Sequence, residues 1–380
     1  MQSLLNKRTI QNKMVQSVYI HIPFCVKKCK YCSFTSFETL EKRKGYLYSL
    51  LKEIDYYYKG EPLKTFYIGG GTPSVMEIGE LKKIVDKFNF EDICERTIEL
   101  NPNDVTPDYA NGLKELGFNR VSLGSQTFDD KLLKLIGRRH TSSEIITAVK
   151  NLKNAGFMNI SLDFIYGLPN QTISGFKADL EKVFELDVQH ISLYGLKIDE
   201  GSYFYQHSPE NLPDDDCQAD MYLLANKLVK EHGFEHYEIS NYSKSGFQSR
   251  HNSNYWRCGE YYGFGVSAHG FEGDIRYSNT TNLAEYMNDP TDRLMGKFLT
   301  KQDELEERIF LGFRLEEGVD VNKINTDFGI DFDNKYDKIL KKYLDTGHLL
   351  RTKNGYKLNN SEEHNGFLLS NMILSEFIEN

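Results

Sequence analysis

Residues 18–37, VYIHIPFCVKKCKYCSFTSF, place three cysteines directly behind a short apolar run. The opening letters VYIHI predict a β-strand, and Pro23 ends it because proline cannot donate a hydrogen bond to a sheet. The strand delivers Cys25, Cys29 and Cys32 onto one loop. Soft thiolates suit iron–sulfur, zinc or copper(I) centres, so this loop is predicted to bind metal.

The number of sulfur ligands bears on the kind of metal site. A closed zinc site needs four donors, and the usual iron–sulfur cluster takes four cysteines. Three thiolates would leave one iron of a cluster open to a small molecule. The alternative is a zinc knuckle completed by His21 or by a further cysteine, although the usual zinc spacings differ from C-x3-C-x2-C.

The C-x3-C-x2-C spacing closely resembles the signature of the radical S-adenosylmethionine (SAM) enzymes. An aromatic residue before the last cysteine is typical of that family, and here it is Tyr31. The resemblance implies that Cys25, Cys29 and Cys32 hold a [4Fe–4S] cluster. It also implies that the amine and carboxylate of SAM chelate the fourth iron.

Length and composition limit the classes of function. The 380 residues suffice for a large domain and a smaller one, and the formal net charge of −9 argues against a nucleic-acid partner. No apolar run approaches the roughly 20 residues of a membrane span. The first residues lack the apolar core of a signal peptide, so we expect a cytoplasmic protein whose six cysteines stay reduced.

Strand-like and helix-like segments alternate along the first half of the chain, which predicts βα units and a parallel sheet. Six strands are expected before residue 200: residues 18–22, 65–71, 96–100, 120–124, 159–167 and 190–196. Six units resemble the open (β/α)6 barrel that is usual in the radical SAM family, whereas a complete barrel has eight. The expected fold class is therefore α/β, a partial (β/α)6 barrel with a smaller C-terminal α+β module.

The domain organisation follows from the same alternation. We expect a flexible N-terminus over residues 1–14, the barrel over 15–200, an extension over 201–300 and a C-terminal module over 301–380. In the last segment two amphipathic helices precede a hairpin at Asn354-Gly355, which predicts a winged-helix-like module. Acidic residues outnumber basic ones there, which favours a lid or docking surface over DNA binding.

Polar residues fall where the predicted strands end, and such a barrel carries its chemistry at that edge. Each of these residues also has a simple structural explanation. The glycines could form a tight turn, Arg138 could cap the preceding helix, and the buried carboxylates could pair with a structural arginine such as Arg120. Together they resemble the SAM-binding set of the oxygen-independent coproporphyrinogen III oxidase branch. The resemblance places these residues around SAM: Tyr19, Gly70, Gly71, Thr72, Glu99, Gln126, Arg138, Asp163 and Gly195.

A second informative stretch, RHNSNYWRCGEYYGFGVSAHGF, spans residues 250–271 and holds the one tryptophan. Histidines beside flat aromatic rings suit a porphyrin, although composition alone favours an ordinary core. HNSNYW matches the H-N-x-x-Y-W motif of the heme chaperone subfamily of this branch. The match implies that His251 binds haem, with Tyr255 and Trp256 packing nearby. Cys258 and His269 are further ligand candidates.

Two functions follow from these resemblances. The oxidases carry C-x3-C-x2-C-x-C and a long segment before the cluster, whereas here Phe34 stands at the fourth position and Cys25 comes early. We therefore expect a heme chaperone that passes haem to an acceptor protein, soluble or in a membrane, and the resemblance is compatible with a homodimer. Oxidative decarboxylation of coproporphyrinogen III by radical SAM chemistry is the alternative, which leaves open whether the chain is an enzyme.

Overall fold

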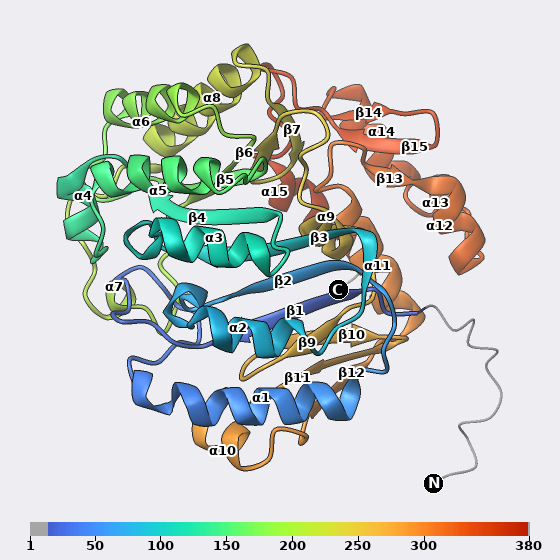
Figure 1. Ribbon diagram of the computed structural model, residues 1–380. Helices are drawn as coiled ribbons and strands as arrows, with labels where there is room; N and C mark the ends of the chain where they lie inside the picture. Colours follow the sequence, from blue (N-terminus) through green and yellow to red (C-terminus); the bar gives the residue numbers. More distant parts are fainter. Residues whose placement is uncertain (1–13, 379–380) are drawn as a thin grey trace, which may run out of the picture.

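The computed structural model describes residues 14–378. Six βα units open the chain (Figure 1). Their elements are β1 (Ser17–Ile22), α1 (Arg43–Tyr57), β2 (Leu63–Gly70), α2 (Ile78–Val85), β3 (Phe90–Leu100), α3 (Pro107–Glu115), β4 (Arg120–Gln126), α4 (Asp130–Leu135), α5 (Ser142–Asn154), β5 (Ile160–Tyr166), α6 (Ile173–Glu185) and β6 (His190–Gly195).

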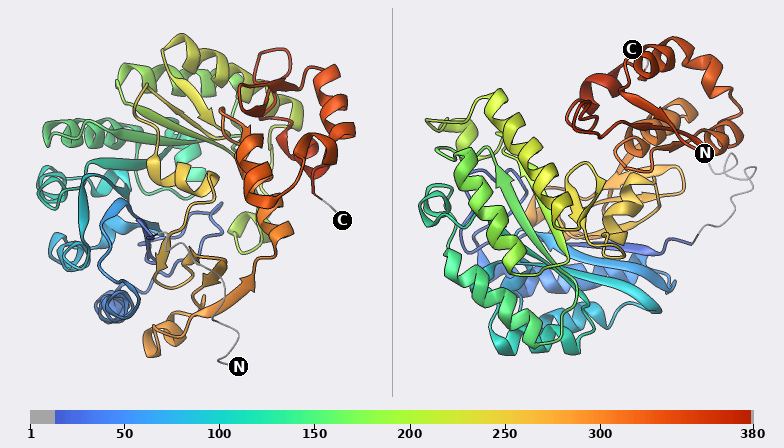
Figure 2. Two further views of the ribbon diagram at one scale, coloured as in Figure 1. Left: turned by 90° about the vertical axis from the view of Figure 1, so that its right-hand side faces the viewer. Right: turned by 90° about the horizontal axis from the view of Figure 1, so that it is seen from above.

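The sheet confirms the predicted fold class. Among the described residues nine strands pair in the order β7-β8-β6-β5-β4-β3-β2-β1-β9, and β1 to β6 are mutually parallel. The strands form an arc with the helices of the βα units on its outer side (Figure 2). Because all six strands run the same way, their carboxyl ends share one rim.

Helix starts follow local sequence signals. Thr141 and Glu144 form a capping box at α5, and Thr172 caps α6. Such caps satisfy the first free N–H groups of a helix. Leucine, isoleucine, valine and phenylalanine from both layers fill one large core between the sheet and the helices.

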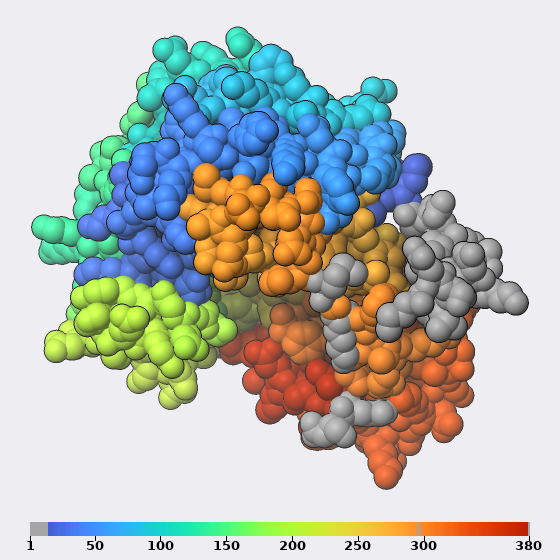
Figure 3. Space-filling model, turned by 90° about the horizontal axis from the view of Figure 1, so that it is seen from below, coloured from blue at the N-terminus to red at the C-terminus, as the bar shows by residue number. Residues whose placement is uncertain are grey.

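The middle of the chain extends the sheet at both edges. Its elements are α7 (Tyr203–Gln206), α8 (Asp215–Glu231), β7 (Glu235–Glu238), β8 (Asn241–Ser243), α9 (Arg250–Trp256), β9 (Tyr262–Phe264), β10 (His269–Glu272), β11 (Ile275–Ser278), α10 (Leu283–Asn288) and β12 (Leu294–Phe298). β9 joins β1 in parallel, whereas β8 joins β6 antiparallel. Strands β10, β11 and β12 form a separate small sheet, and α10 packs against α1 (Figure 3).

The C-terminal module has its own apolar core and lies to one side of the barrel (Figure 2). Its elements are α11 (Lys301–Gly312), β13 (Val319–Asp320), α12 (Val321–Phe328), α13 (Phe332–Lys335), α14 (Asp337–Asp345), β14 (Leu349–Arg351), β15 (Gly355–Leu358) and α15 (Ser370–Ser375). The β14–β15 hairpin turns over residues 352–355, one residue earlier than the predicted Asn-Gly turn, since Thr352 N donates to Gly355 O at 2.8 Å and Gly355 already begins β15. The helices precede the hairpin as the winged-helix-like prediction requires.

The predicted flexible N-terminus lies outside the described residues, apart from Met14. The domain boundaries at residues 200 and 300 stay predictions. None of the helices between residues 14 and 378 has the length and apolar character that a bilayer-spanning segment requires.

Candidate functional site

The three cysteines lie on one loop at the rim where the parallel strands end. Backbone hydrogen bonds close the base of the loop, from Cys25 N to Phe37 O at 3.0 Å and from Phe37 N to Pro23 O at 2.7 Å. The loop is also tied to its surroundings, because Lys30 N donates to Ile136 O and Phe204 N donates to Lys30 O. The cysteine positions are therefore set by β1, α4 and α7 together.

Side chains from neighbouring strand ends reach the sulfur atoms. Thr72 Oγ1 donates to Cys25 Sγ at 3.4 Å, and Arg138 Nη1 donates to Cys29 Sγ at 3.5 Å. Asn101 bridges the two donors, since its Oδ1 accepts from Arg138 and its Nδ2 donates to Thr72. The Arg138 side chain also donates to Gly124 O, so it belongs to the rim, while the backbone N–H of Arg138 donates to Leu133 O at the end of α4.

The loop suits a cluster better than a single ion. Among residues 14–378 no three His, Cys, Asp or Glu side chains are arranged to bind one metal ion. The ring of His21 is already engaged, at 3.0 Å from Tyr19 Oη and 2.9 Å from Thr35 O, which removes it as a zinc ligand. A cubane cluster makes a different demand, because each thiolate binds a different iron.

The cysteine loop packs closely against Gly71, which forms the glycine floor of the site. A Cβ on Gly71 would stand 2.8 Å from Phe24 O and 3.1 Å from Cys25 Sγ. Burial raises the pKa of the Cys25 thiol, and it raises the pKa of Cys32 to about 11. Metal binding must therefore displace protons from these sulfurs. The donor set and the glycine floor fit a cluster held by Cys25, Cys29 and Cys32.

Two carboxylates face the barrel interior next to the rim. Tyr67 Oη donates to Glu99 Oε1 at 2.7 Å, and Gly70 N donates to Glu99 Oε2 at 3.1 Å. Burial raises the pKa of Glu99 to about 7, and the two hydrogen bonds oppose that rise. Glu99 therefore changes charge near neutral pH, which is unusual for a carboxyl group.

Asp163 is held by serines of its own and the adjacent strand. Ser122 Oγ donates to Asp163 Oδ2 at 2.8 Å and Ser161 Oγ donates to Oδ1 at 3.1 Å. Burial raises the pKa of Asp163, while these hydrogen bonds and the charge of Arg120 oppose that rise. The charge of Arg120 thus acts on Asp163, whereas serine hydroxyls donate the hydrogen bonds to its carboxylate.

The remaining predicted SAM residues occupy the same rim. Tyr31 is half-buried, and the charges of Cys29 and Arg138 act on its pKa, which burial raises. Gln126 is buried at the end of β4 in a left-handed conformation, with φ 68°. Gly195 ends β6, where a Cβ would meet the ring of Tyr166 at 3.1 Å. The structure thus brings the predicted SAM residues together, and their roles toward SAM stay predictions.

Sequence reasoning missed several residues of the rim. Tyr67 and Ser122 contact Glu99 and Asp163 there, and His21, considered only as a zinc ligand, contacts Tyr19. The signal available was period-two alternation, since His21 lies two residues after Tyr19 on the same face of β1. The residues that these side chains contact on other strands could not be identified from the sequence.

His251 lies at the opposite ends of the strands. Its ring nitrogens bond Thr65 Oγ1 at 2.8 Å and Tyr255 Oη at 2.6 Å, and the side chain is 1% exposed. Its ring stacks on Tyr67 at a centroid distance of 5.0 Å. His251 is thus part of a packed layer that reaches Glu99 through Tyr67. Its predicted role in haem binding stays a prediction.

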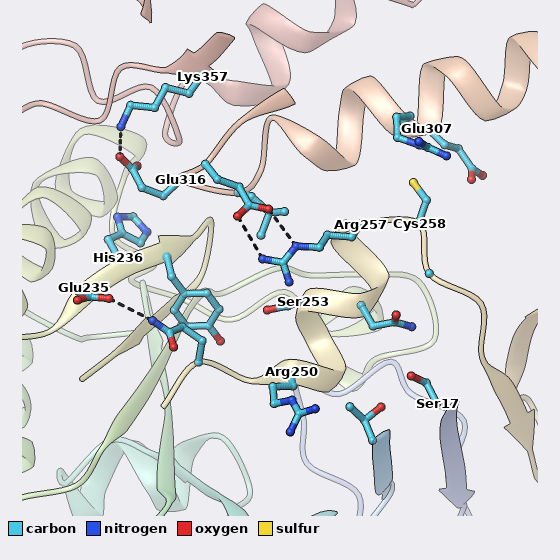
Figure 4. Close-up of a pocket in the computed structure, with 18 of the residues that line it drawn as sticks. Ser17, Glu235, His236, Arg250, Ser253, Arg257, Cys258, Glu307, Glu316 and Lys357 are labelled. Carbon is cyan, nitrogen blue, oxygen red and sulfur yellow. Dashed lines mark hydrogen bonds and ion pairs between the residues drawn. The ribbon is translucent and has the colours of Figure 1, made fainter. Parts of the chain in front are cut away.

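A groove of about 1500 Å³ opens at these amino-terminal strand ends, between α9, β7 and the C-terminal module (Figure 4). Two ion pairs lie in it: Arg257 Nε is 2.9 Å from Glu317, and Lys357 Nζ is 2.5 Å from Glu316. Cys258 lines this groove, so it is separated from the cluster loop by the length of the strands.

Comparison with known proteins agrees with this geometry. The model of the radical SAM superfamily matches residues 19–183, and that of the HemN C-terminal domain matches residues 299–361. The solved structure described as coproporphyrinogen III oxidase (HemN) from Escherichia coli superposes with a TM-score of 0.84. That match covers 95% of this chain and 89% of the other at 22% identity, which establishes the fold alone.

Closer relatives share the name heme chaperone HemW. The Lactococcus lactis protein is 37% identical over 95% of this chain and 97% of its own length. The Bacillus subtilis protein is 35% identical over 96% and 99% of the two chains. The Escherichia coli protein is 36% identical over 76% and 78%. Radical SAM membership implies a [4Fe–4S] cluster and SAM as cofactors, and the chain belongs to the heme chaperone HemW family of the radical SAM superfamily.

Proposed function

We propose that this protein is a heme chaperone: it binds haem together with a SAM-liganded [4Fe–4S] cluster and transfers the haem to an acceptor protein. The observation that carries the proposal is the 35–37% identity to proteins named heme chaperone over nearly the whole chain. Phe34, 65% exposed where an oxidase-type loop would place a further cysteine, supports the same choice.

Different residues of the rim would bind the cluster and SAM. Cys25, Cys29 and Cys32 would bind the cluster, while Thr72 and Arg138 donate hydrogen bonds to two of the sulfurs. Hydrogen bonds and positive charge near cluster sulfurs tune the reduction potential of such centres. A reduced cluster with bound SAM supplies one-electron chemistry in this superfamily.

The residues facing SAM would act as binding groups. Glu99 is fixed by Tyr67 and Gly70, and Asp163 is fixed by its serines, so both carboxylates are oriented before any ligand arrives. Preorganised acceptors suit a ligand that carries a positive charge, as SAM does at its sulfonium. Haem would be the cargo, and its acceptor a haem-requiring protein, soluble or membrane-bound.

An anaerobic activity assay separates the chaperone from the oxidase. The reconstituted protein is incubated with coproporphyrinogen III, SAM and a one-electron reductant, beside an authentic oxidase as positive control. We expect no protoporphyrinogen from this protein and full conversion by the control. Turnover of coproporphyrinogen III would overturn the proposal. In parallel, one equivalent of haem should bind and shift the Soret band.

A further inference from the structure

The ten histidines of the chain differ in what their ring nitrogens contact, and all ten lie within residues 14–378. Three are buried with both ring nitrogens in hydrogen bonds: His21, His190 and His251. A buried imidazole of this kind must break a hydrogen bond before it can bind iron. His251 in particular would have to leave Thr65 or Tyr255.

The other histidines are freer to different degrees. Six have one ring nitrogen in a hydrogen bond: His140, His207, His232, His236, His348 and His364. His269 is exposed, and the described residues offer its ring no hydrogen bond. Because one free ring nitrogen is enough to bind iron, His269 and these six can all accept a ligand bond without losing a hydrogen bond, and His269 is distinguished from them by its place in the fold.

His269 begins β10 beside the cluster loop. Two residues before it, Ser267 Oγ accepts a hydrogen bond at 3.0 Å from Thr35 Oγ1, which lies just after the last cysteine of the loop. The backbone of His269 crosses directly over Gly263 of β9, and Gly263 pairs with Tyr19 of β1. His269 thus stands one strand away from the rim that holds the predicted SAM residues.

Electrostatics agree with this placement. Burial lowers the pKa of His21 to about 4, its hydrogen bond to Thr35 opposes the shift, and the charge of His269 lowers it further. The two imidazoles are therefore close enough to interact. Since His21 contacts Tyr19, His269 lies near this part of the rim.

Two half-buried tyrosines, Tyr255 and Tyr261, lie between β10 and the barrel interior. Tyr261 and Phe271 exchange backbone hydrogen bonds, which fix Tyr261 against β10. The ring of Tyr255 packs edge-on against Tyr261 at 4.5 Å, and Tyr255 Oη is held by His251. Flat rings with polar tips are a suitable wall for a porphyrin.

Resting on the proposed haem-carrier function, we propose that a ring nitrogen of His269 ligates the haem iron at the rim. His251 is then a positioning residue, which holds Tyr255 and through it the aromatic wall. The bond is a simple coordination, in which the neutral imidazole donates a lone pair to iron and no electron is transferred. Haem would then sit beside the cluster loop, away from the polar groove at the other strand ends.

Haem titration of the full-length, anaerobically reconstituted protein tests this assignment. The variants are His269→Ala and, as matched control, His207→Ala, which removes an exposed histidine just after α7. His269→Ala should bind haem about tenfold or more weakly, with altered Soret maximum and electron paramagnetic resonance g-values. Added imidazole should restore the wild-type spectrum, and His207→Ala should match wild type throughout.

The possible outcomes test the assignment of His269 as ligand and the haem-carrier function separately. Unchanged spectra and affinity in His269→Ala, while the wild-type protein binds haem, would overturn the ligand assignment and leave the carrier function standing. Absence of haem binding by the wild-type protein would overturn the carrier function itself. Iron content of the cluster reports on folding, so a His269→Ala protein with normal iron and weak, imidazole-rescued haem binding supports the assignment.

Discussion

Gly71 is where the cluster loop and the second strand come closest. A side chain there would contact Phe24 O and Cys25 Sγ at distances shorter than van der Waals contact. Gly71→Ala must therefore push the loop away from β2, at a cost of about 1–3 kcal/mol. We expect the iron bound per chain after anaerobic reconstitution to fall several-fold.

Gly79→Ala is the matched control for this change. An added Cβ on Gly79 meets no atom within 4 Å, and the residue lies in α2, where alanine is the better helix former. Iron content should equal that of wild type or exceed it. Equal iron content in Gly71→Ala and Gly79→Ala would show that the cluster does not use this floor.

Glu99 should make SAM binding depend on pH. Its pKa of about 7 means that the carboxyl is neutral in acid and charged above neutrality, and the charged form attracts cationic SAM. SAM affinity, measured by calorimetry, should therefore rise between about pH 6 and about pH 8. Glu99→Gln should make that rise shallower and bind SAM about tenfold more weakly at the upper pH, while the part of the rise that comes from deprotonation of the iron-chelating SAM amine remains.

An exposed acid in the loop after β6 controls for the general effect of charge. Glu200→Gln removes the same charge from the surface and should keep the wild-type pH profile. A Glu99→Gln protein whose affinity climbs with pH as steeply as that of wild type would show that Glu99 does not contribute to the pH dependence.

At the scale of the element, α9 is held to the barrel floor by one buried carboxylate. Glu95 Oε2 accepts from Arg250 N at 2.8 Å and Glu95 Oε1 accepts from His251 N at 3.0 Å. Glu95→Ala leaves both N–H groups without their acceptor, so unfolding free energy should drop by about 2–4 kcal/mol. Asp92→Ala, at an exposed position of the same strand, should stay within about 0.5 kcal/mol of wild type in urea unfolding. Similar losses in both variants would contradict this anchoring.

The elements that could be predicted are those with a repeating local signal. The six βα units and the Asn-Gly hairpin were all foreseeable because apolar period and turn chemistry act over a few residues. The edge strands β7, β8 and β9 were not predicted, since they have only three or four residues and their partners lie far away in the sequence. A strand that short carries almost no alternation of its own.

At the scale of the whole molecule, the candidate site joins residues that local patterns cannot connect. Thr65 and His251 are 186 residues apart, and Thr35 and Ser267 are 232 apart. The sequence located the cysteines and the strand-end residues because the barrel rule gathers strand ends at one rim. It could not show that His251 is enclosed or that β10 returns His269 to that rim, because both depend on how distant segments pack.

The central claim is that three thiolates at this rim hold a four-iron cluster with one iron open to SAM. Mössbauer spectroscopy of the iron-57 protein, reconstituted anaerobically and recorded with and without SAM, tests it most directly. Because three irons carry a cysteine and one does not, the account predicts that SAM changes the signal of one iron and leaves the other three unchanged. A spectrum that SAM does not alter, or a colourless protein that binds zinc in place of iron, would contradict the account.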